Sequence, residues 1–186
     1  MEEINLMMDM TRESMEQAIA HLEKELAKVR TGKASPNMIA DLLVEYYGSP
    51  TRLSQVANIA SADTRTLTIQ PWEKSMIRPI ENAIFEANLG VTPQNDGELI
   101  RLSFPPLTEE RRREMVKKAK TYGEDSKVGI RSARRDAMEE IKKAVKNGFA
   151  EDAGKGKEAY VQDLTNKFSD KVDNLLAAKE KEIMSI

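Results

Sequence analysis

The chain has 186 residues, of which 40% are hydrophobic, 32% are charged and 5% are aromatic, and its formal net charge is −2. This composition favours long helices around one core or two small ones. The absence of cysteine excludes disulfides, thiol chemistry and cysteine-based metal sites. Neither a signal-peptide pattern nor an apolar run of about 18 residues is present, so we expect a soluble, cytoplasmic protein.

Residues 2–30 are predicted to form one long helix. Hydrophobic residues recur at seven-residue intervals, and two more flank them: Met8, Met15, Leu22 and Val29, with Ile19 and Leu26. Such a repeat packs against other helices in a bundle or a coiled coil. Gly32 and Pro36 should end the helix, because both residues disfavour its continuation.

Residues 31–105 have the pattern of a small α/β unit. Strands are predicted at residues 41–47, 53–60, 64–70 and 98–104, where β-branched and aromatic residues lie between turn signals. A helix should run from about Ser75 or Pro79 to Leu89, with Gly90 as its C-terminal cap. The sequence Asn95-Asp96-Gly97 predicts a turn before the last strand.

Pro105 and Pro106 end this unit, and a second long helix should follow from Thr108 to about Lys146. Thr108 is a favourable N-cap, and the glutamates that follow it suit the positive end of a helix. Asn147-Gly148 should terminate the helix.

A glycine-rich turn over residues 151–157 and a third helix over residues 157–184 are predicted to complete the chain. The apolar face of the third helix contains Val161, Leu164, Phe168, Val172, Leu175 and Ile183. Because none of the three long helices can bury its apolar stripe alone, they should form one bundle.

The predicted fold class is therefore α+β, an L-shaped two-domain molecule. Residues 1–30 and 106–186 form a long three-helix bundle, and residues 31–105 form an inserted small β/α/β domain. The two connections between the domains permit hinge motion in a restricted direction. The candidate hinge residues are Thr31, Gly32, Phe104, Pro105 and Pro106.

The second helix carries a line of basic residues, here named the basic ridge. Residues 106–150 hold 13 basic and 8 acidic side chains, whereas the remainder of the chain is net negative. Helical spacing places six of the basic residues on one side of the helix, away from its hydrophobic face. These six are Arg113, Lys117, Lys120, Lys127, Arg131 and Arg134.

Two interpretations of the basic ridge are open at this point. Lysine and arginine on the outer face of a bundle helix are most often simply solvated. The concentration of arginine in residues 111–113 and 131–135 favours phosphate binding instead, because the planar guanidinium donates paired hydrogen bonds. Few aromatic residues accompany the ridge, which favours folded RNA over single-stranded bases.

A catalytic interpretation has little support in the sequence. His21 is the single histidine, and no metal-ligand spacing is present. Residues 153–157, Ala-Gly-Lys-Gly-Lys, lack the spacing of a phosphate-binding loop and follow a helix rather than a strand. The alternatives that remain are a helical scaffold or adaptor, an RNA-binding chaperone and an enzyme housed in the α/β unit.

Several motifs in the right order resemble the bacterial ribosome recycling factor family over the whole chain. They are residues 30–36 (Arg-Thr-Gly-Lys-Ala-Ser-Pro), residues 44–48 (Val-Glu-Tyr-Tyr-Gly), Pro71-Trp72, Gly97 with Ile100-Arg101, residues 105–112 and residues 131–137. That family's fold is a three-helix bundle with an inserted β/α/β domain, in agreement with the architecture expected above.

The resemblance implies a function after the termination of protein synthesis. Members bind the post-termination ribosome and, with elongation factor G and its GTP hydrolysis, help to separate the subunits and release messenger and transfer RNA. The chain itself would be no enzyme, need no cofactor or small-molecule substrate, avoid membranes and act as a monomer. The hydrolysis would belong to the partner.

The resemblance also implies which residues meet large-subunit ribosomal RNA. Arg131, Arg134 and Arg135 are the main candidates, and the ridge residues Arg113, Lys117, Lys120 and Lys127 extend that surface. Arg30, Gly32, Arg111 and Arg112, together with Arg113, are secondary candidates near the connections. Gly129, Ser132 and Ala133 are smaller than the family pattern leads us to expect, and Gly129 could soften the helix.

Overall fold

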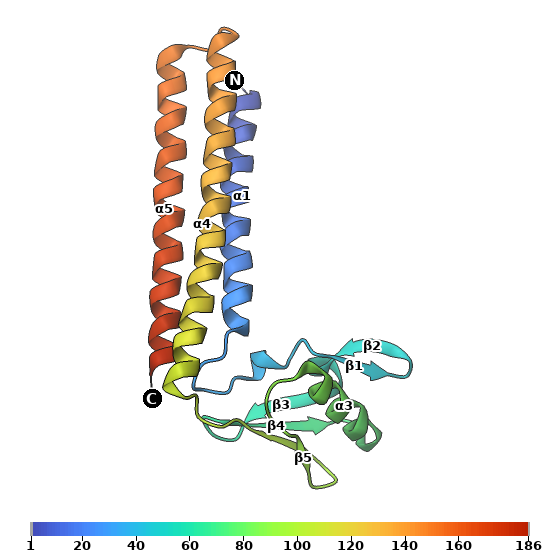
Figure 1. The fold of residues 1–186 in the computed structure, drawn as a ribbon. Helices are drawn as coiled ribbons and strands as arrows, with labels where there is room; N and C mark the ends of the chain where they lie inside the picture. The colour runs from blue at the N-terminus through green and yellow to red at the C-terminus, as the bar shows by residue number, and fades with distance from the viewer. Residues whose placement is uncertain (1, 186) are drawn as a thin grey trace. The chain divides into compact units, whose positions relative to one another are not determined.

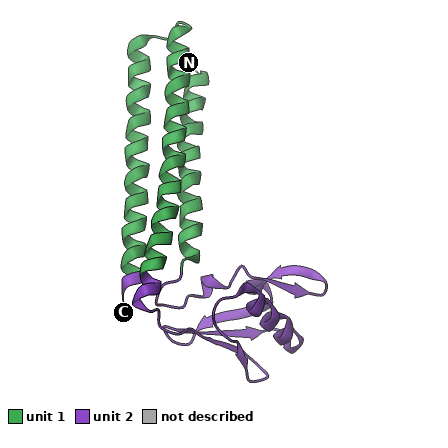
Figure 2. Cartoon of the chain, viewed as in Figure 1, with its two compact units in different colours: residues 1–29, 113–182 green, residues 30–112, 183–186 purple. Residues whose placement is uncertain are grey.

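The computed structural model describes residues 2–185, which form two compact units (Figure 2). Unit 1 contains the chain up to Val29 together with residues 113–182, and unit 2 contains Arg30–Arg112 together with the chain from Ile183. Residues 106–112, expected in the bundle, therefore belong to unit 2. Leu107, at the start of this segment, is buried, as is Phe104 just before it.

Unit 1 is a bundle of three long helices that lie side by side (Figure 1). They are α1 (Glu2–Lys28), α4 (Glu109–Lys146, of which the first turn belongs to unit 2) and α5 (Glu151–Met184). Helix α4 runs antiparallel to both of the others. This arrangement confirms the predicted three-helix bundle.

The core of the bundle is the hydrophobic stripe that the seven-residue repeat predicted. Met8, Met15, Leu22 and Val29 are all buried, and Met15 and Leu22 are at most 1% exposed. Helix α4 contributes small and β-branched residues, including Ala119, Ile130, Ala137 and Ile141, and α5 contributes Val161, Leu164, Phe168 and Val172. Burial of these side chains stabilises the bundle by about 1.5–3 kcal/mol for each large residue.

Within residues 2–185, the buried polar side chains of the bundle are hydroxyls that donate to backbone carbonyls. Thr11 donates to Met7 O at 2.9 Å, and Thr165 donates to Val161 O at 2.8 Å within their own helices. Ser126 Oγ of α4 donates across to Ala18 O of α1 at 3.2 Å. The buried hydroxyls therefore carry little desolvation penalty.

The predicted turn over residues 151–157 is wrong, because helix α5 already begins at Glu151. The connection is shorter and lies at residues 147–150, where Gly148 has φ 103° and Phe149 N–H donates to Ala144 O. Gly154 is helical and faces α4. A Cβ there would lie 2.6 Å from Val145 Cγ2, so this glycine allows the two helices to approach closely.

Unit 2 contains a two-stranded hairpin and a four-stranded antiparallel sheet. The hairpin pairs β1 (Leu43–Tyr46) with β2 (Ser49–Arg52). The sheet has the order β3-β4-β6-β5, formed by Ala57–Ser61, Thr66–Pro71, Ile100–Ser103 and Gln94–Asn95. Helical segments are η1 (Pro36–Met38), α2 (Leu53–Val56), η2 (Lys74–Met76) and α3 (Ile77–Ala87).

Unit 2 has its own hydrophobic core between α3, the sheet and the hairpin. Its fully buried members come from these elements, from α2 and from the end of η1: Ile39, Val44, Leu53, Leu67, Ile69, Ile80, Ile84, Ile100 and Leu102. Alternation along β4 and β6 sends Leu67, Ile69, Ile100 and Leu102 to the core, as strand periodicity requires.

The predicted strands before β3 in unit 2 need correction. Residues 53–60 are not one strand, because Leu53–Val56 form a helical turn that buries Leu53 and Val56 before β3 begins. The residues between the predicted strands 41–47 and 53–60 are not only a turn, because Ser49–Arg52 form β2. Pro50 lies in this strand, opposite Glu45, in a two-stranded hairpin where a missing N–H is tolerated.

The cap of α3 is Asn88 rather than Gly90. Asn88 has φ 51° and ψ 52°, and its N–H donates to Phe85 O at 3.2 Å. Asparagine adopts this left-handed conformation more readily than most residues, which explains why helix α3 ends two residues earlier than the glycine indicated.

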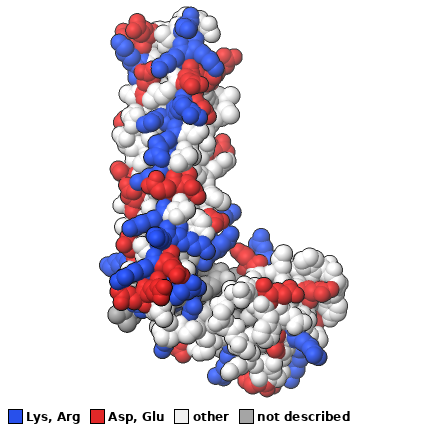
Figure 3. All heavy atoms as spheres, viewed as in Figure 1, with Lys and Arg blue, Asp and Glu red and all other residues white. Residues whose placement is uncertain are grey.

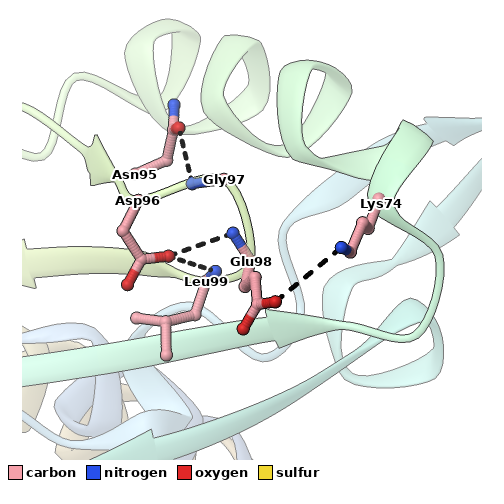
Figure 4. A network of polar contacts seen from close by, with 6 residues as sticks. All are labelled: Lys74, Asn95, Asp96, Gly97, Glu98 and Leu99. Atoms are coloured by element: carbon pink, nitrogen blue, oxygen red, sulfur yellow. Dashed lines mark hydrogen bonds and ion pairs between the residues drawn. The ribbon is translucent and has the colours of Figure 1, made fainter.

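The turn at residues 95–97 is confirmed and is stabilised by side chains (Figure 4). Asp96 Oδ1 accepts hydrogen bonds from the N–H groups of Glu98 and Leu99, each at 3.0 Å. These bonds, that of Leu99 first, lower the pKa of Asp96. Glu98 forms an ion pair of 3.8 Å with Lys74, which joins the turn to the start of η2.

Within residues 2–185, no helix is both long enough and apolar enough to cross a membrane.

Two glycines of α4 should respond in opposite directions to substitution. A Cβ on Gly123 would lie 2.9 Å from Leu176 Cγ of α5, so Gly123→Val should overpack the interface and lower the free energy of unfolding by about 1–3 kcal/mol. A Cβ on Gly129 would have only Ala18 Cβ nearby, at 4.0 Å. Gly129→Ala should therefore raise the free energy of unfolding by about 0.5–1 kcal/mol.

Urea unfolding followed by circular dichroism measures both effects. A Gly129→Ala variant no more stable than the parent would contradict the view that Gly129 only weakens the helix. A Gly123→Val variant of parental stability would contradict the close packing of α4 on α5.

Candidate polyanion-binding surface

The basic ridge lies along α4, and the packing of α4 decides which of its cations face solvent. Thr108 caps the helix, and its Oγ1 accepts the N–H of Arg111 at 3.2 Å. The buried face of α4 contains Ala119, Gly123, Ser126, Ile130, Ala137 and Ile141. Arg113, Lys117, Lys120 and Arg131 are exposed, whereas Lys127 and Arg134, nearer to the buried face, are half-buried.

Charged side chains gather in several groups along unit 1. Figure 3 shows groups of Lys and Arg over the bundle with acidic groups between them. On the face drawn there, the positive groups form separate patches rather than one unbroken positive surface. The partners of each cation decide which patches can receive an anion.

Lys127 is less available to bind an anion than its position in the ridge indicated. Its Nζ lies 2.6 Å from Asp173 Oδ1 of α5, and its side chain is only 23% exposed. Lys127 sits at the flank of the buried face, so its side chain reaches the neighbouring helix. The charge of Lys127 is therefore used mainly in contact with α5 and is less available to an anion in solution.

Arg131 and Arg134 are the ridge arginines best placed to bind an anion. Neither has an ion pair with any residue in the described range 2–185. Arg135 pairs with Asp136 at 3.8 Å, but both side chains are about 70% exposed. Such an exposed pair contributes little and is readily exchanged for another partner.

Arg30, one of the secondary candidates, is held inside unit 2. Its Nη2 donates to Pro105 O at 2.6 Å, and its guanidinium lies 5.4 Å from the centre of the Phe104 ring. Burial, followed by the nearby charge of Arg111, lowers the pKa of Arg30. Arg30 therefore ties the first connection to the second rather than projecting into solvent.

Both connections are also bonded to the turn between β3 and β4. Ala34 N–H donates to Thr64 O at 2.7 Å, and Phe104 N–H donates to Arg65 O at 2.8 Å. Phe104, a candidate hinge residue, is 4% exposed and belongs to the core of unit 2. The candidate hinge positions outside these anchors are Thr31, Gly32, Pro105 and Pro106.

Sequence reasoning missed two cations that lie beside this region, Lys33 and Arg65. A cavity of about 340 Å³ within unit 2 is lined by both of them and by Arg112, together with Gly32, Thr64, Pro106, Leu107 and Ser185. Arg112 Nε is buried and has no hydrogen-bond partner in the described part of the chain. Lys33 and Arg65 are far apart along the chain, so no local spacing could have grouped them.

His21 lies in a groove of about 410 Å³ between α1 and α4. Ala18 and Gly129 leave room there, and Glu25, Tyr122 and Asp125 share the walls. Across residues 2–185, no group of three or more histidine, cysteine, aspartate or glutamate side chains has the geometry to hold a metal ion. His21 therefore remains a groove residue without an assigned chemical function.

The family model described as "Ribosome recycling factor" matches residues 22–184. The chain belongs to the ribosome recycling factor family. It is 55% identical over 185 residues to the ribosome-recycling factor of Flavobacterium psychrophilum, covering 100% of this chain and 99% of the relative. It is 53% identical over 186 residues to that of Cytophaga hutchinsonii, covering 100% of both chains.

Solved structures of the family agree with the fold. The solution structure of a ribosome recycling factor matches with a TM-score of 0.85 at 36% identity, covering 100% of both chains. A second match is the T. thermophilus ribosome recycling factor, in a structure with E. coli elongation factor G bound to the E. coli post-termination complex. It has a TM-score of 0.68 at 39% identity and covers 98% of this chain and 99% of that one. Ribosome recycling factors are translation factors rather than enzymes.

The Lys127–Asp173 pair should stabilise the bundle. Lys127→Met and Asp173→Asn should each lower the free energy of unfolding, with a coupling in the double variant of about 0.5–1 kcal/mol, because the pair is partly exposed. Thermal unfolding of the four proteins measures this coupling. It should shrink in about 1 M salt, where charges are screened over about 3 Å. A coupling of zero at low salt would contradict the ion pair.

Proposed function

We propose that this chain binds the post-termination ribosome and, with elongation factor G and GTP, promotes dissociation of the subunits and release of messenger and transfer RNA. The observation that carries the proposal is membership of the ribosome recycling factor family over the whole chain. The related structure that combines a recycling factor with elongation factor G on a post-termination complex supports the partnership. This function places the chain in the cytoplasm.

The bundle is the part proposed to hold ribosomal RNA. Arg131, Arg134 and Arg135 supply guanidinium groups, and Lys117 and Lys120 extend the positive surface along α4. Neutralising phosphates releases condensed counterions, so binding should be fast and strongly dependent on salt. Arginine forks pair with phosphate oxygens, and ribosomal RNA is the proposed partner because the chain belongs to the ribosome recycling factor family.

The proposed mechanism is mechanical. Helix α4 has 38 residues and is about 57 Å long, and its packing against α1 and α5 makes it stiff enough to transmit a push. Unit 2 receives the push from the GTPase partner, and the bundle carries it to the contacts between subunits. The chemical energy comes from the partner, so the chain needs positioned charges and rigid elements rather than catalytic groups.

Motion at the connections is a further part of this proposal. Thr31, Gly32, Pro105 and Pro106 lie outside the hydrogen bonds that anchor Ala34 and Phe104 to the β3–β4 turn. The bond from Arg30 to Pro105 O couples the two connections, so they should move together. A pair of coupled connections restricts the direction of a hinge without preventing it.

Neutralising the ridge arginines should weaken ribosome binding while the fold is kept. Arg131→Gln combined with Arg134→Gln should reduce affinity for large subunits by at least about tenfold and lower the slope of log K against log salt by about two. Sedimentation with purified large subunits at several salt concentrations measures both. Lys118→Gln is the matched control, because Lys118 is an exposed cation of the same helix away from the ridge.

Equal losses in the ridge variant and the Lys118 control would contradict a specific surface. Binding to naked duplex RNA should be weaker than binding to intact large subunits. Equal affinity for both would favour an RNA chaperone instead.

Joining the two units covalently should separate binding from recycling. Because the natural chain has no cysteine, one cysteine introduced in each unit can be cross-linked uniquely with reagents of different lengths. The cross-linked chain should bind ribosomes with unchanged affinity and lose disassembly of post-termination complexes in the presence of elongation factor G and GTP. Full disassembly activity with a short cross-link would show that hinge motion is dispensable.

A further inference from the structure

Exposed aromatic side chains are concentrated in unit 2. Among residues 2–185, the exposed aromatic residues are Tyr47, Trp72, Phe85 and Tyr160, and the first three belong to unit 2. Tyr47 is the most exposed of them, at 79%. Exposed aromatic residues are enriched at the centres of protein–protein interfaces. The surface around Tyr47 is therefore a candidate contact for a protein.

Tyr47 occupies a position that disfavours a large side chain. It is at the tip of the hairpin, between the paired residues Tyr46 and Ser49, with φ 47°, and Gly48 follows with φ 82°. A two-residue turn with two positive φ angles favours asparagine followed by glycine. A tyrosine in this left-handed region is strained, and such residues cluster at functional sites.

The hydroxyl of Tyr47 shares one carboxylate with the neighbouring tyrosine. Tyr47 Oη donates to Glu73 Oε2 at 2.8 Å, and Tyr46 Oη donates to Glu73 Oε1 at 3.0 Å. The two rings meet edge to face, with centroids 4.6 Å apart and an interplanar angle of 76°. The hydrogen bonds to Glu73 raise the pKa of both phenols, so both stay protonated and keep donating at neutral pH.

The carboxylate of Glu73 has no cationic partner of its own. No ion pair of Glu73 is present in the described residues, and the adjacent Lys74 is paired with Glu98 at 3.8 Å. Each oxygen accepts one phenol and retains a further lone pair. Two aromatic rings beside an unpaired carboxylate match a guanidinium, which stacks on rings and forms paired hydrogen bonds with carboxylates. The same carboxylate disfavours RNA phosphate.

We propose that the Tyr46–Tyr47–Glu73 cluster holds an arginine side chain of the protein partner of unit 2. This inference rests on the proposed function, in which that partner is elongation factor G. The positive groups of the bundle and this negative aromatic cluster then select different macromolecules. The cluster binds the protein partner, and the basic ridge binds RNA.

Tyr47→Asn is the decisive variant, because asparagine suits the turn but lacks the ring and the phenol. Purified chains would be assayed for binding to post-termination ribosomes alone, for the concentration of elongation factor G needed for half-maximal subunit splitting, and for thermal unfolding. Tyr47→Asn should melt no lower than the parent and bind ribosomes equally. It should require at least about tenfold more elongation factor G.

Two conservative variants test the parts of the cluster. Tyr47→Phe keeps the ring, and Glu73→Gln keeps the size but removes the charge. Each should raise the required concentration of elongation factor G by a smaller factor, about threefold to tenfold. Glu73→Gln should also weaken the dependence of that concentration on salt.

The possible outcomes separate this inference from the proposed function. An unchanged requirement for elongation factor G in Tyr47→Asn would overturn the assignment. Loss of ribosome affinity by Tyr47→Asn before the factor is added would also overturn it, because the cluster would then contact the ribosome. Failure of the natural chain to bind or split ribosomes would instead contradict the proposed function.

Discussion

Three apolar stripes are buried against one another in unit 1, and this packing governs the other features of the bundle. It orients α4 by directing Ala119, Ile130, Ala137 and Ile141 inward. Once these residues are buried, helical geometry turns Arg131 outward and leaves Lys127 and Arg134 at the flanks. The cationic surface is therefore a consequence of packing as much as of charge.

The two units present different chemistry to solvent. The bundle offers guanidinium and ammonium groups along α4, while unit 2 offers exposed aromatic rings and a carboxylate held by two phenols. Desolvation and charge favour phosphate at the first surface and a basic protein at the second. The proposed function, which joins an RNA assembly to a protein motor, needs both surfaces on one chain.

The structure differs from the sequence-based predictions at segments whose local pattern is compatible with two conformations. Glycine at residue 154 indicated a turn, yet it allows α5 to pack closely against Val145 of α4. Residues 53–60 had strand-forming side chains, yet Leu53 and Val56 reach the core better from a helical turn. Asn88, rather than Gly90, adopts the left-handed conformation that ends α3. In each case burial or hydrogen bonding overrode propensity.

Spacing along the chain is enough to predict the helices, their hydrophobic faces, the inserted α/β unit and the position of the ridge. The folding of the chain in three dimensions sets which cations lie against an acid, since Asp173 engages Lys127 from a different helix. It alone brought Glu73 to Tyr46 and Tyr47, and Arg30 to Pro105. Contacts between residues dozens of positions apart depend on how elements pack, which local periodicity does not encode.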